Sequence, residues 1–123
     1  MILCKPDMKR AILRRDKYVT RRQGKRRWKI GSWHLLYTRP PFTKGGAKPF
    51  ARVQIVSVID EDMPGTRCGI SADLPGEARR EGFPHWAAFC TKYLEINGTD
   101  ALDKPCWRVE WDPDTMEVLE AAE

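Results

Sequence analysis

The run Lys17-Tyr18-Val19-Thr20-Arg21-Arg22 is the stretch that most constrains the fold of this 123-residue chain. Residues 18–22 are expected to form a strand, which the β-branched side chain of Thr20 suits. This segment concentrates an ammonium, a hydroxyl and two guanidinium groups, and like charges on a strand repel one another when nothing binds them. We therefore expect the segment to face an anion or a polar heterocycle.

The flanking sequence predicts further elements on both sides of this run. A short apolar strand is expected at residues 2–4, and a helix begins at Pro6, where proline needs no partner for an N–H group. The pair Gln23-Gly24 indicates a turn after the run. The next strand spans residues 32–39, and alternate side chains share one of its faces; these are Trp33, Leu35 and Tyr37.

The second half of the chain adds a long strand and two helices. Residues 52–59 are rich in Val and Ile on both faces, which predicts a strand that is covered on both sides. Helices are expected to begin near Pro75 and Pro84. The second helix ends at Asn97-Gly98 and carries a continuous apolar stripe, formed by Trp86, Phe89, Cys90, Tyr93 and Leu94.

The order of these elements predicts the fold class. A last strand places Trp107, Val109 and Trp111 on one face. Strands outnumber helices and do not alternate strictly with them, so we expect an α+β domain with a small curled sheet or β-barrel of about five to six strands flanked by helices. One domain is expected over residues 1–112, followed by an acidic tail over residues 113–123 that is frayed after Thr115.

Length and cysteine content narrow the class of protein. A chain of 123 residues can bury a real core, and no apolar run approaches the ~20 residues of a membrane span. Its early charges do not fit a signal peptide, so we expect a soluble, cytoplasmic protein that is monomeric by default. Zinc-site spacings are absent, so we expect free thiols, no metal and no cofactor; the residues concerned are Cys4, Cys68, Cys90, Cys106, His34 and His85.

The net charge of +5 conceals a strong asymmetry along the chain. Residues 1–58 hold 16 Lys and Arg against two acids, whereas residues 59–123 hold six against 15. A basic face of this kind attracts polyanions, although the alternative is a solvated face that pairs with the acidic half. We favour nucleic acid, with base stacking by Trp28 and phosphate contacts from Arg21, Arg22, Lys25, Arg26 and Arg27.

Four segments, taken in order, resemble the ASCH family, a branch of the PUA-like superfamily. The first contains the K-x-x-T-x-R signature as Lys17, Thr20 and Arg22. The others resemble the family's turn into its next strand, its E-G-F/Y element before a helix and its closing strand; they span residues 28–31, 79–83 and 106–111. The resemblance covers roughly residues 1–112. It departs from the family at two positions, with Arg15 in place of the usual Gly and Trp111 in place of Phe.

The resemblance implies a PUA-like β-barrel with a cleft, and a role in RNA or nucleotide biology. Some members of the family resemble amidohydrolases that remove the acetyl group from N4-acetylcytidine, whereas others resemble RNA binders or ribonucleases. Carried over to this chain, the amidohydrolase set is Lys17, Thr20 and Glu81, with Arg22 as a contact for an anion or a carbonyl group.

The residue chemistry is compatible with such an amidase. The Thr20 hydroxyl needs a base within hydrogen-bond reach, and Lys17 can be that base if Arg21 and Arg22 destabilise its ammonium form. Glu81 would then donate a proton to the departing amine. On a straight strand, however, Lys17 and Thr20 face opposite sides. Their convergence requires Lys17 to precede the strand or to lie on a bulge.

Four functions therefore stand open. We favour an RNA- or modified-nucleoside-binding protein with a basic cleft, and the first alternative is the amidohydrolase. A ribonuclease would use Lys17 and Glu81 for proton transfer, and an interaction module would bind an acidic protein through its basic face. Taken singly, Thr20 suits an ordinary strand, Lys17 a solvated charge and Glu81 an exposed ion pair of little energetic value.

Overall fold

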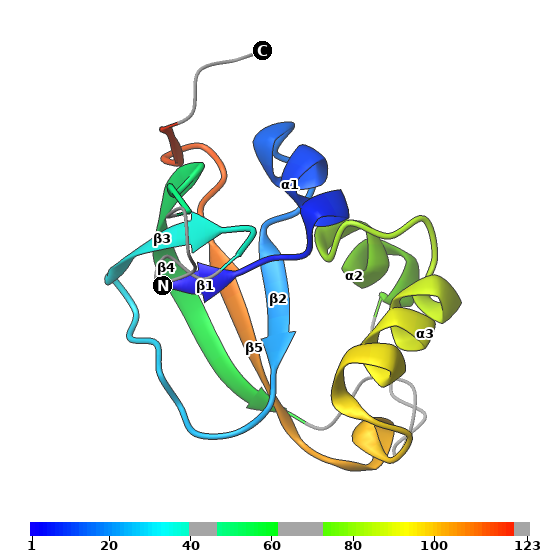
Figure 1. Ribbon diagram of the computed structural model, residues 1–123. Helices are drawn as coiled ribbons and strands as arrows, with labels where there is room; N and C mark the ends of the chain where they lie inside the picture. The colour runs from blue at the N-terminus through cyan, green and yellow to red at the C-terminus, as the bar shows by residue number, and fades with distance from the viewer. Residues whose placement is uncertain (40–46, 62–72, 120–123) are drawn as a thin grey trace.

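Six strands form one curled sheet in the computed structural model of the chain, which describes residues 1–39, 47–61 and 73–119 (Figure 1). The order across the sheet is β1-β3-β4-β5-β2, and β6 pairs with β4. The pair β1–β3 is parallel and the other pairs are antiparallel. The strands are β1 (Ile2–Leu3), β2 (Val19–Arg22), β3 (Trp33–Tyr37), β4 (Ala51–Glu61), β5 (Cys106–Trp111) and β6 (Glu117–Val118).

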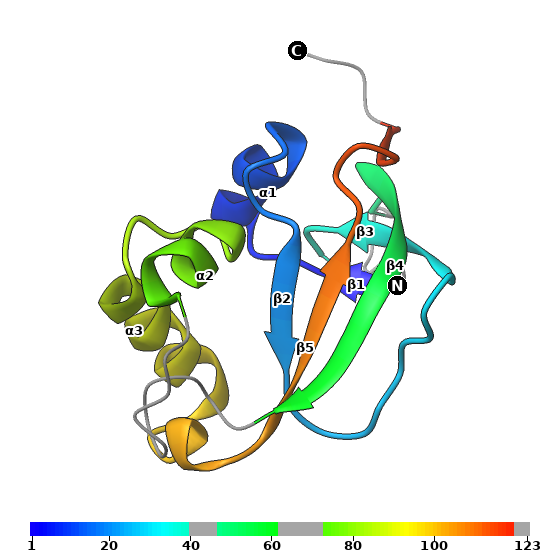
Figure 2. The same ribbon diagram turned by 180° about the vertical axis from the view of Figure 1, so that it is seen from behind.

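The curl of the sheet depends on the long strand β4. Its first half pairs with β3 and β6 and its second half pairs with β5, with a register shift between Ile55 and Ser57. A bulge of this kind bends a strand and increases its twist. The sheet consequently closes into a half-barrel, with β2, β5 and β4 side by side when seen from behind (Figure 2). The fold is α+β, as the sequence predicted.

Three α-helices accompany the sheet in the described part of the chain, and they are α1 (Pro6–Leu13), α2 (Leu74–Arg80) and α3 (Trp86–Asn97). A short 3₁₀ helix, η1 (Ala101–Asp103), follows α3. The predicted helix starts at Pro6 and near Pro75 and Pro84 are confirmed to within two residues. Helices α2 and α3 lie beside β2, and α1 lies across one end of the sheet (Figure 1).

The core has two parts. The larger lies inside the half-barrel and contains Leu36, Val53, Ile55, Val109 and Trp111, each at most 1 % exposed. The smaller joins α3 to η1 and β5 through the aromatic stripe of α3: Phe89 stacks on Trp86 at 4.7 Å, and Tyr93 follows one turn later. The predicted apolar stripe of α3 is therefore a packing surface.

Two predictions about strands are wrong. The strand β4 is not covered on both sides, because Val56 and Ile59 are 43 % and 46 % exposed. The tail is not frayed directly after Thr115, because Met116 is buried and β6 pairs Val118 with Ala51 of β4. Both errors arise because pairing partners far away in the sequence decide which apolar side chains are covered.

Candidate functional site

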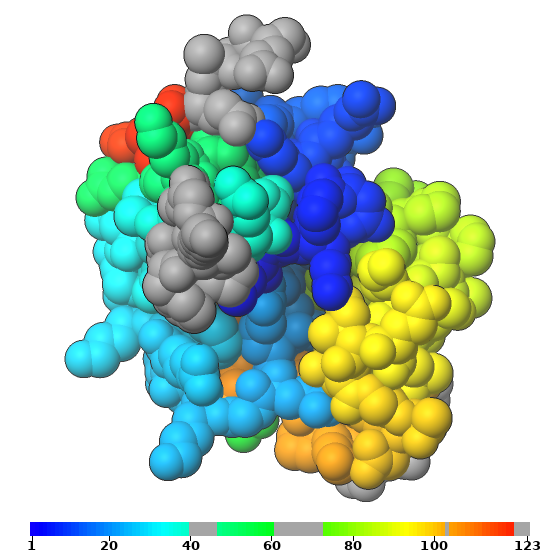
Figure 3. Space-filling model, in the orientation of Figure 1, coloured from blue at the N-terminus to red at the C-terminus, as the bar shows by residue number. Residues whose placement is uncertain are grey.

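A pocket of about 320 Å³ lies between the open side of the half-barrel and α3. Figure 3 shows the hollow between the N-terminal segment, in dark blue, and α3, in yellow. Its walls come from the ends of β1 and β3, from β2, from the segment after α2, and from α3. The lining residues include Cys4, Lys5, Lys17, Thr20, Arg21, Arg22, Thr38, Arg39, Glu81, Phe83, Phe89, Lys92, Tyr93, Ile96 and Asn97.

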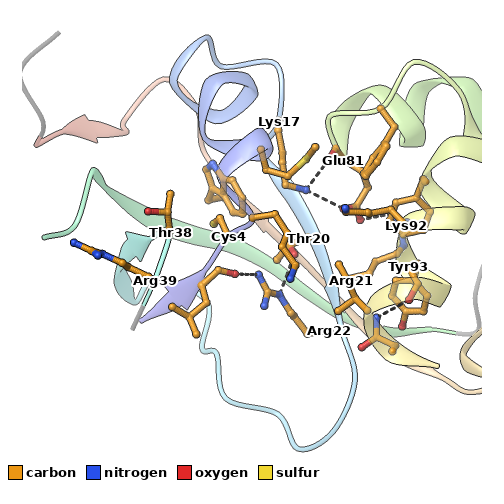
Figure 4. A pocket seen from close by; sticks show the side chains of 18 residues that line it. Cys4, Lys17, Thr20, Arg21, Arg22, Thr38, Arg39, Glu81, Lys92 and Tyr93 are labelled. Atoms are coloured by element: carbon orange, nitrogen blue, oxygen red, sulfur yellow. Dashed lines mark hydrogen bonds and ion pairs between the residues drawn. The ribbon is translucent and has the colours of Figure 1, made fainter. Parts of the chain in front are cut away.

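Lys17 reaches the pocket because of how α1 ends. The amide of Arg15 donates to Ile12 O and the amide of Asp16 donates to Ala11 O, which is a Schellman motif with Arg15 in the left-handed conformation at φ 66°. The amide of Lys17 also donates to Ala11 O. This turn places Lys17 before β2, which begins only at Val19. The expected conflict between Lys17 and Thr20 is thereby removed, and both line the pocket (Figure 4).

Glu81 is placed by a second helix end of the same kind. After α2 the amide of Gly82 donates to Arg79 O and that of Phe83 donates to Ala78 O, with Gly82 at φ 90°. A Cβ atom on Gly82 would lie 3.3 Å from the Lys17 side chain. The absence of that atom allows the backbone of residues 81–82 to approach Lys17 closely.

Lys17 and Glu81 form a buried ion pair at the floor of the pocket. The Lys17 Nζ atom donates to Glu81 Oε1 at 3.0 Å, to Glu81 O at 2.8 Å and to Val19 O at 2.8 Å. The two residues are 5 % and 2 % exposed. Three acceptors match the three N–H donors of an ammonium ion, so Lys17 is held here as a cation bound to an ionised Glu81.

Arg21 is the second cation on Glu81. Its guanidinium donates to Glu81 Oε2 at 2.9 Å and also to Glu77, and it lies 5.4 Å from the centre of the Trp86 ring. Arg21 is 5 % exposed, so it is not on the surface where a phosphate contact was expected. Arg21 and Lys17 therefore share Glu81 as a common counter-ion.

Glu77 ties this cluster to β5. Arg108 donates to both of its carboxylate oxygens, at 2.9 and 3.0 Å, and Arg80 donates at 3.0 Å. Burial alone would raise the pKa of Glu77, but hydrogen bonds from Arg108 and Arg21, with the charges of both, outweigh it and hold that pKa at about 2. Glu77 is therefore a carboxylate at every physiological pH.

Thr20 and Arg22 line the pocket from β2. The Nε atom of Arg22 donates to Thr20 Oγ1 at 3.1 Å, and Nη2 donates to Leu3 O at 2.6 Å, so Arg22 connects the two ends of the half-barrel (Figure 4). Thr20 is buried, whereas Arg22 is half-buried. The Thr20 hydroxyl accepts this hydrogen bond, so its own proton can still be donated to a ligand.

The remaining predicted binding residues lie on the segment between β2 and β3. Lys25, Arg26 and Arg27 are exposed, as phosphate-binding residues must be. Trp28 is 7 % exposed and belongs to the half-barrel core. Its predicted role in base stacking is wrong for this structure, because its indole packs inside the sheet. Sequence could not show this, since exposure of one aromatic residue depends on the whole fold.

Sequence reasoning missed the part of the pocket contributed by α3 and by the segments after β1 and β3. Tyr93 was assigned only to an apolar stripe, and Lys5, Lys92 and Asn97 were not singled out, although all four line the pocket. Burial raises the pKa of Tyr93 well above its usual range, so its hydroxyl is neutral, and the oxygen is itself buried while the ring lines the pocket. The helical spacing of Tyr93, Ile96 and Asn97 was the available signal.

Cys4 lines the pocket but is held as a thiol. Burial raises its pKa, and the nearby charges of Arg22 and Lys17 offset this only in part. Cys90 and Cys106 are also free thiols, and Cys68 lies outside the described residues.

No group of three His, Cys, Asp or Glu side chains among residues 1–39, 47–61 and 73–119 is placed to hold a metal ion. The described helices include none that is long and apolar enough to cross a membrane.

Comparisons with protein-family models, with curated proteins and with solved structures find no match to this chain.

Proposed function

We propose that the chain binds RNA or a modified nucleoside, with one base held in the pocket, as the resemblance to the ASCH family implies. The observation that carries the proposal is the meeting of Lys17, Thr20, Arg22 and Glu81, from segments about 60 residues apart, at a single pocket. Its volume of about 320 Å³ lies at the small end of the range for ligand pockets, roughly 300–1,000 Å³. A single nucleoside suits that volume.

The pocket walls suit a base better than a purely apolar ligand. The Thr20 hydroxyl and the side-chain carbonyl of Asn97, whose Nδ2 atom already donates to Tyr93 O, supply a donor and an acceptor for the edge of a base. Phe83 and Phe89 supply apolar wall, and single-stranded RNA is commonly recognised by this combination of hydrogen bonds and ring contacts. The rest of an RNA chain would follow the exposed residues 25–27, which supply phosphate contacts without base readout.

The amidohydrolase is the second candidate, and one observation favours it. Lys17, Thr20 and Glu81, the set that the family resemblance implies, all line the same pocket. The hydrogen bonds around Lys17 and Glu81 favour a binding protein over an amidohydrolase, because Lys17 is held as an ammonium ion and Glu81 accepts from two cations. An amidase would have to move the Lys17 proton before Thr20 could be activated.

Calorimetric titration of the chain with cytidine and with N4-acetylcytidine tests the proposal. We expect binding that Thr20→Val weakens by about five- to tenfold, the cost of one lost hydrogen bond of roughly 1 kcal/mol. Thr91→Val is the matched control, because Thr91 is exposed on α3 and donates only to Ala87 O. Absence of binding by both nucleosides and by a short single-stranded RNA would overturn the proposal.

Mass spectrometry of the N4-acetylcytidine sample separates the two candidates. Release of cytidine by the native chain, abolished by Thr20→Val, would establish the amidohydrolase. Thr20→Val is a sharper variant than Lys17→Ala, because loss of Lys17 would leave buried Glu81 with Arg21 as its remaining cation. Binding without turnover would support the binding protein.

A further inference from the structure

We infer that the ligand of the pocket carries a phosphate group, which binds to Arg22, Lys5 and Lys92 at the mouth. This inference rests on the proposed function and narrows its ligand from a nucleoside to a nucleoside phosphate. The three cations come from three different parts of the fold: Lys5 precedes α1, Arg22 ends β2 and Lys92 lies on α3.

The charges inside the pocket are compensated, whereas those at the mouth are not. The residues that line the pocket include six basic side chains and one acid, Glu81. Both oxygens of Glu81 already accept hydrogen bonds from Lys17 and Arg21, and Arg21 is further paired with Glu77. No carboxylate is therefore left among the described lining residues to neutralise the cations at the mouth.

Arg22 has donors to spare at the position where an anion would bind. A guanidinium has five N–H donors, and the hydrogen bonds of Arg22 to Thr20 Oγ1 and Leu3 O use two of them. Both acceptors are uncharged. Arg22 therefore lies across the pocket mouth as a cation with a fixed orientation and without a carboxylate partner in the described chain (Figure 4).

Lys5 and Lys92 line the same pocket as Arg22 and carry their charges on flexible side chains. Lys5 is exposed and has no acidic partner among the described residues. Lys92 has only Glu95, three residues further along α3, at 3.6 Å, and the Glu95 side chain is 62 % exposed. A contact of this kind contributes little. Cations held near one another without counter-ions raise the local concentration of anions and favour their binding.

The size of the pocket is the reason for assigning the phosphate to Arg22, Lys5 and Lys92. A volume of about 320 Å³ accommodates a base and its sugar, so an attached phosphate stays at the mouth. Arg39 also lines the pocket, but its guanidinium extends away from Thr20 (Figure 4). The inferred site therefore consists of Arg22, Lys5 and Lys92.

Titration of the intact chain with cytidine, cytidine monophosphate and the dinucleotide CpC tests the inference. We expect the monophosphate to bind at least about tenfold more tightly than cytidine, because charge-assisted hydrogen bonds are each worth roughly 1.5–3 kcal/mol. Lys5→Gln and Lys92→Gln should each reduce that advantage about threefold or more, because each lowers monophosphate affinity by more than cytidine affinity. Arg10→Gln, which removes an exposed charge outside the pocket, is the matched control and should leave both affinities unchanged.

The possible outcomes separate this inference from the proposed function. Equal affinities for cytidine and the monophosphate would overturn the inference and leave the proposed function standing. Inorganic phosphate that binds through Lys5, with no binding of any nucleoside, would retain the anion site and overturn the proposed function. A loss of monophosphate affinity in Arg10→Gln equal to that in Lys5→Gln would indicate only the electrostatic field of the whole protein and would overturn the site. Tighter binding of CpC than of the monophosphate would assign the phosphate to an RNA chain, and the reverse would assign it to a free nucleotide.

Discussion

At the scale of single residues, the site depends on charges that are buried together. Lys17, Arg21, Glu77 and Glu81 are each between 1 % and 13 % exposed at the side chain, and each carboxylate has at least two cationic partners. Burial of an ion is costly unless its partners and hydrogen bonds compensate it. Removal of any one member should therefore lower the free energy of unfolding by more than removal of a surface ion pair elsewhere in the chain.

Glu77 makes this cluster sensitive to acid. Its pKa falls from an ordinary 4.5 to about 2 in the fold, so its stabilising contribution is complete above pH 4.5 and is lost as the pH falls from 4.5 to 2. The contribution is on the order of 3 kcal/mol. Urea unfolding from pH 7 to pH 2 should show that Glu77→Gln is much less stable than the native chain at pH 7 and that the gap shrinks below pH 4.5.

The control for this prediction is Glu117→Gln. Glu117 pairs with Arg52 at 3.4 Å, and its side chain is 52 % exposed, so its loss should change stability little at any pH. A constant gap between native chain and Glu77→Gln across the acid range would contradict the low pKa of Glu77.

Arg15 and Gly82 hold equivalent positions after α1 and α2, and they predict opposite effects of substitution. Both have a positive φ, of 66° and 90°, which costs a residue with a Cβ atom about 1 kcal/mol. Arg15→Gly should therefore stabilise the chain by about 0.5–1 kcal/mol. Gly82→Ala should destabilise it by more, because its Cβ would lie 3.2 Å from Met8 Sδ.

Chemical denaturation of both variants checks this pair of predictions. Arg14→Gly is the control, because Arg14 has a helical φ of −79° and glycine there should destabilise. Equal effects of Arg14→Gly and Arg15→Gly would show that the conformation of Arg15 is not strained. The left-handed conformation of Arg15 is the physical reason why glycine suits this position.

At the scale of elements, α3 is the wall that completes the pocket, and its first turn depends on His85. The Nδ1 atom of His85 accepts the amide of Ala88 at 3.1 Å. His85→Ala should destabilise the chain by about 0.5–2 kcal/mol, and His85→Asp should be at least as stable as the native chain, because a carboxylate is a better N-cap acceptor near the positive end of a helix.

Hydrogen exchange locates this effect. Amides in the first turn of α3 should exchange faster in His85→Ala, while those of β4 and β5 should be unchanged. Uniform acceleration throughout the sheet, or none in α3, would contradict a local capping role for His85.

The sequence predicted the helices and strands better than it predicted which side chains they bury and which strands they pair with. The three helices and five of the strands followed from turn residues and periodicity, whereas the sequence left open whether Lys17 and Thr20 converge. The burial of Trp28 and the ordering of β6 did not follow. Each depends on a partner distant in the sequence, since Trp28 packs in the half-barrel core and β6 pairs with Ala51 and Arg52.

At the scale of the whole molecule, the charge asymmetry along the chain is resolved in part by ion pairs. Basic residues of the first half pair with acids of the second half in Lys17–Glu81, Arg21–Glu77 and Arg52–Glu117. This is the alternative that the sequence left open. Exposed basic residues remain at positions 25–27, on the segment that connects β2 to β3, and these are free to contact a polyanion.

This distribution predicts how RNA affinity depends on salt. Affinity for a short single strand should fall steeply between ~50 and ~200 mM salt. In a plot of the logarithm of affinity against the logarithm of salt concentration, Arg26→Gln with Arg27→Gln should reduce the magnitude of the slope by about 1–2. Arg10→Gln with Arg14→Gln is the matched control, because Arg10 on α1 and Arg14 directly after it are exposed, at the opposite end of the molecule (Figure 1). Equal slopes in the two double variants would contradict a role for the exposed basic segment.

The central claim is that the pocket between the half-barrel and α3 holds a nucleoside, and NMR titration of the labelled chain with cytidine tests it most directly. We predict chemical-shift changes at Thr20, Arg22, Tyr93 and Asn97, which line the pocket, and none at residues 25–27. Changes confined to residues 25–27, or no changes at all, would contradict the claim.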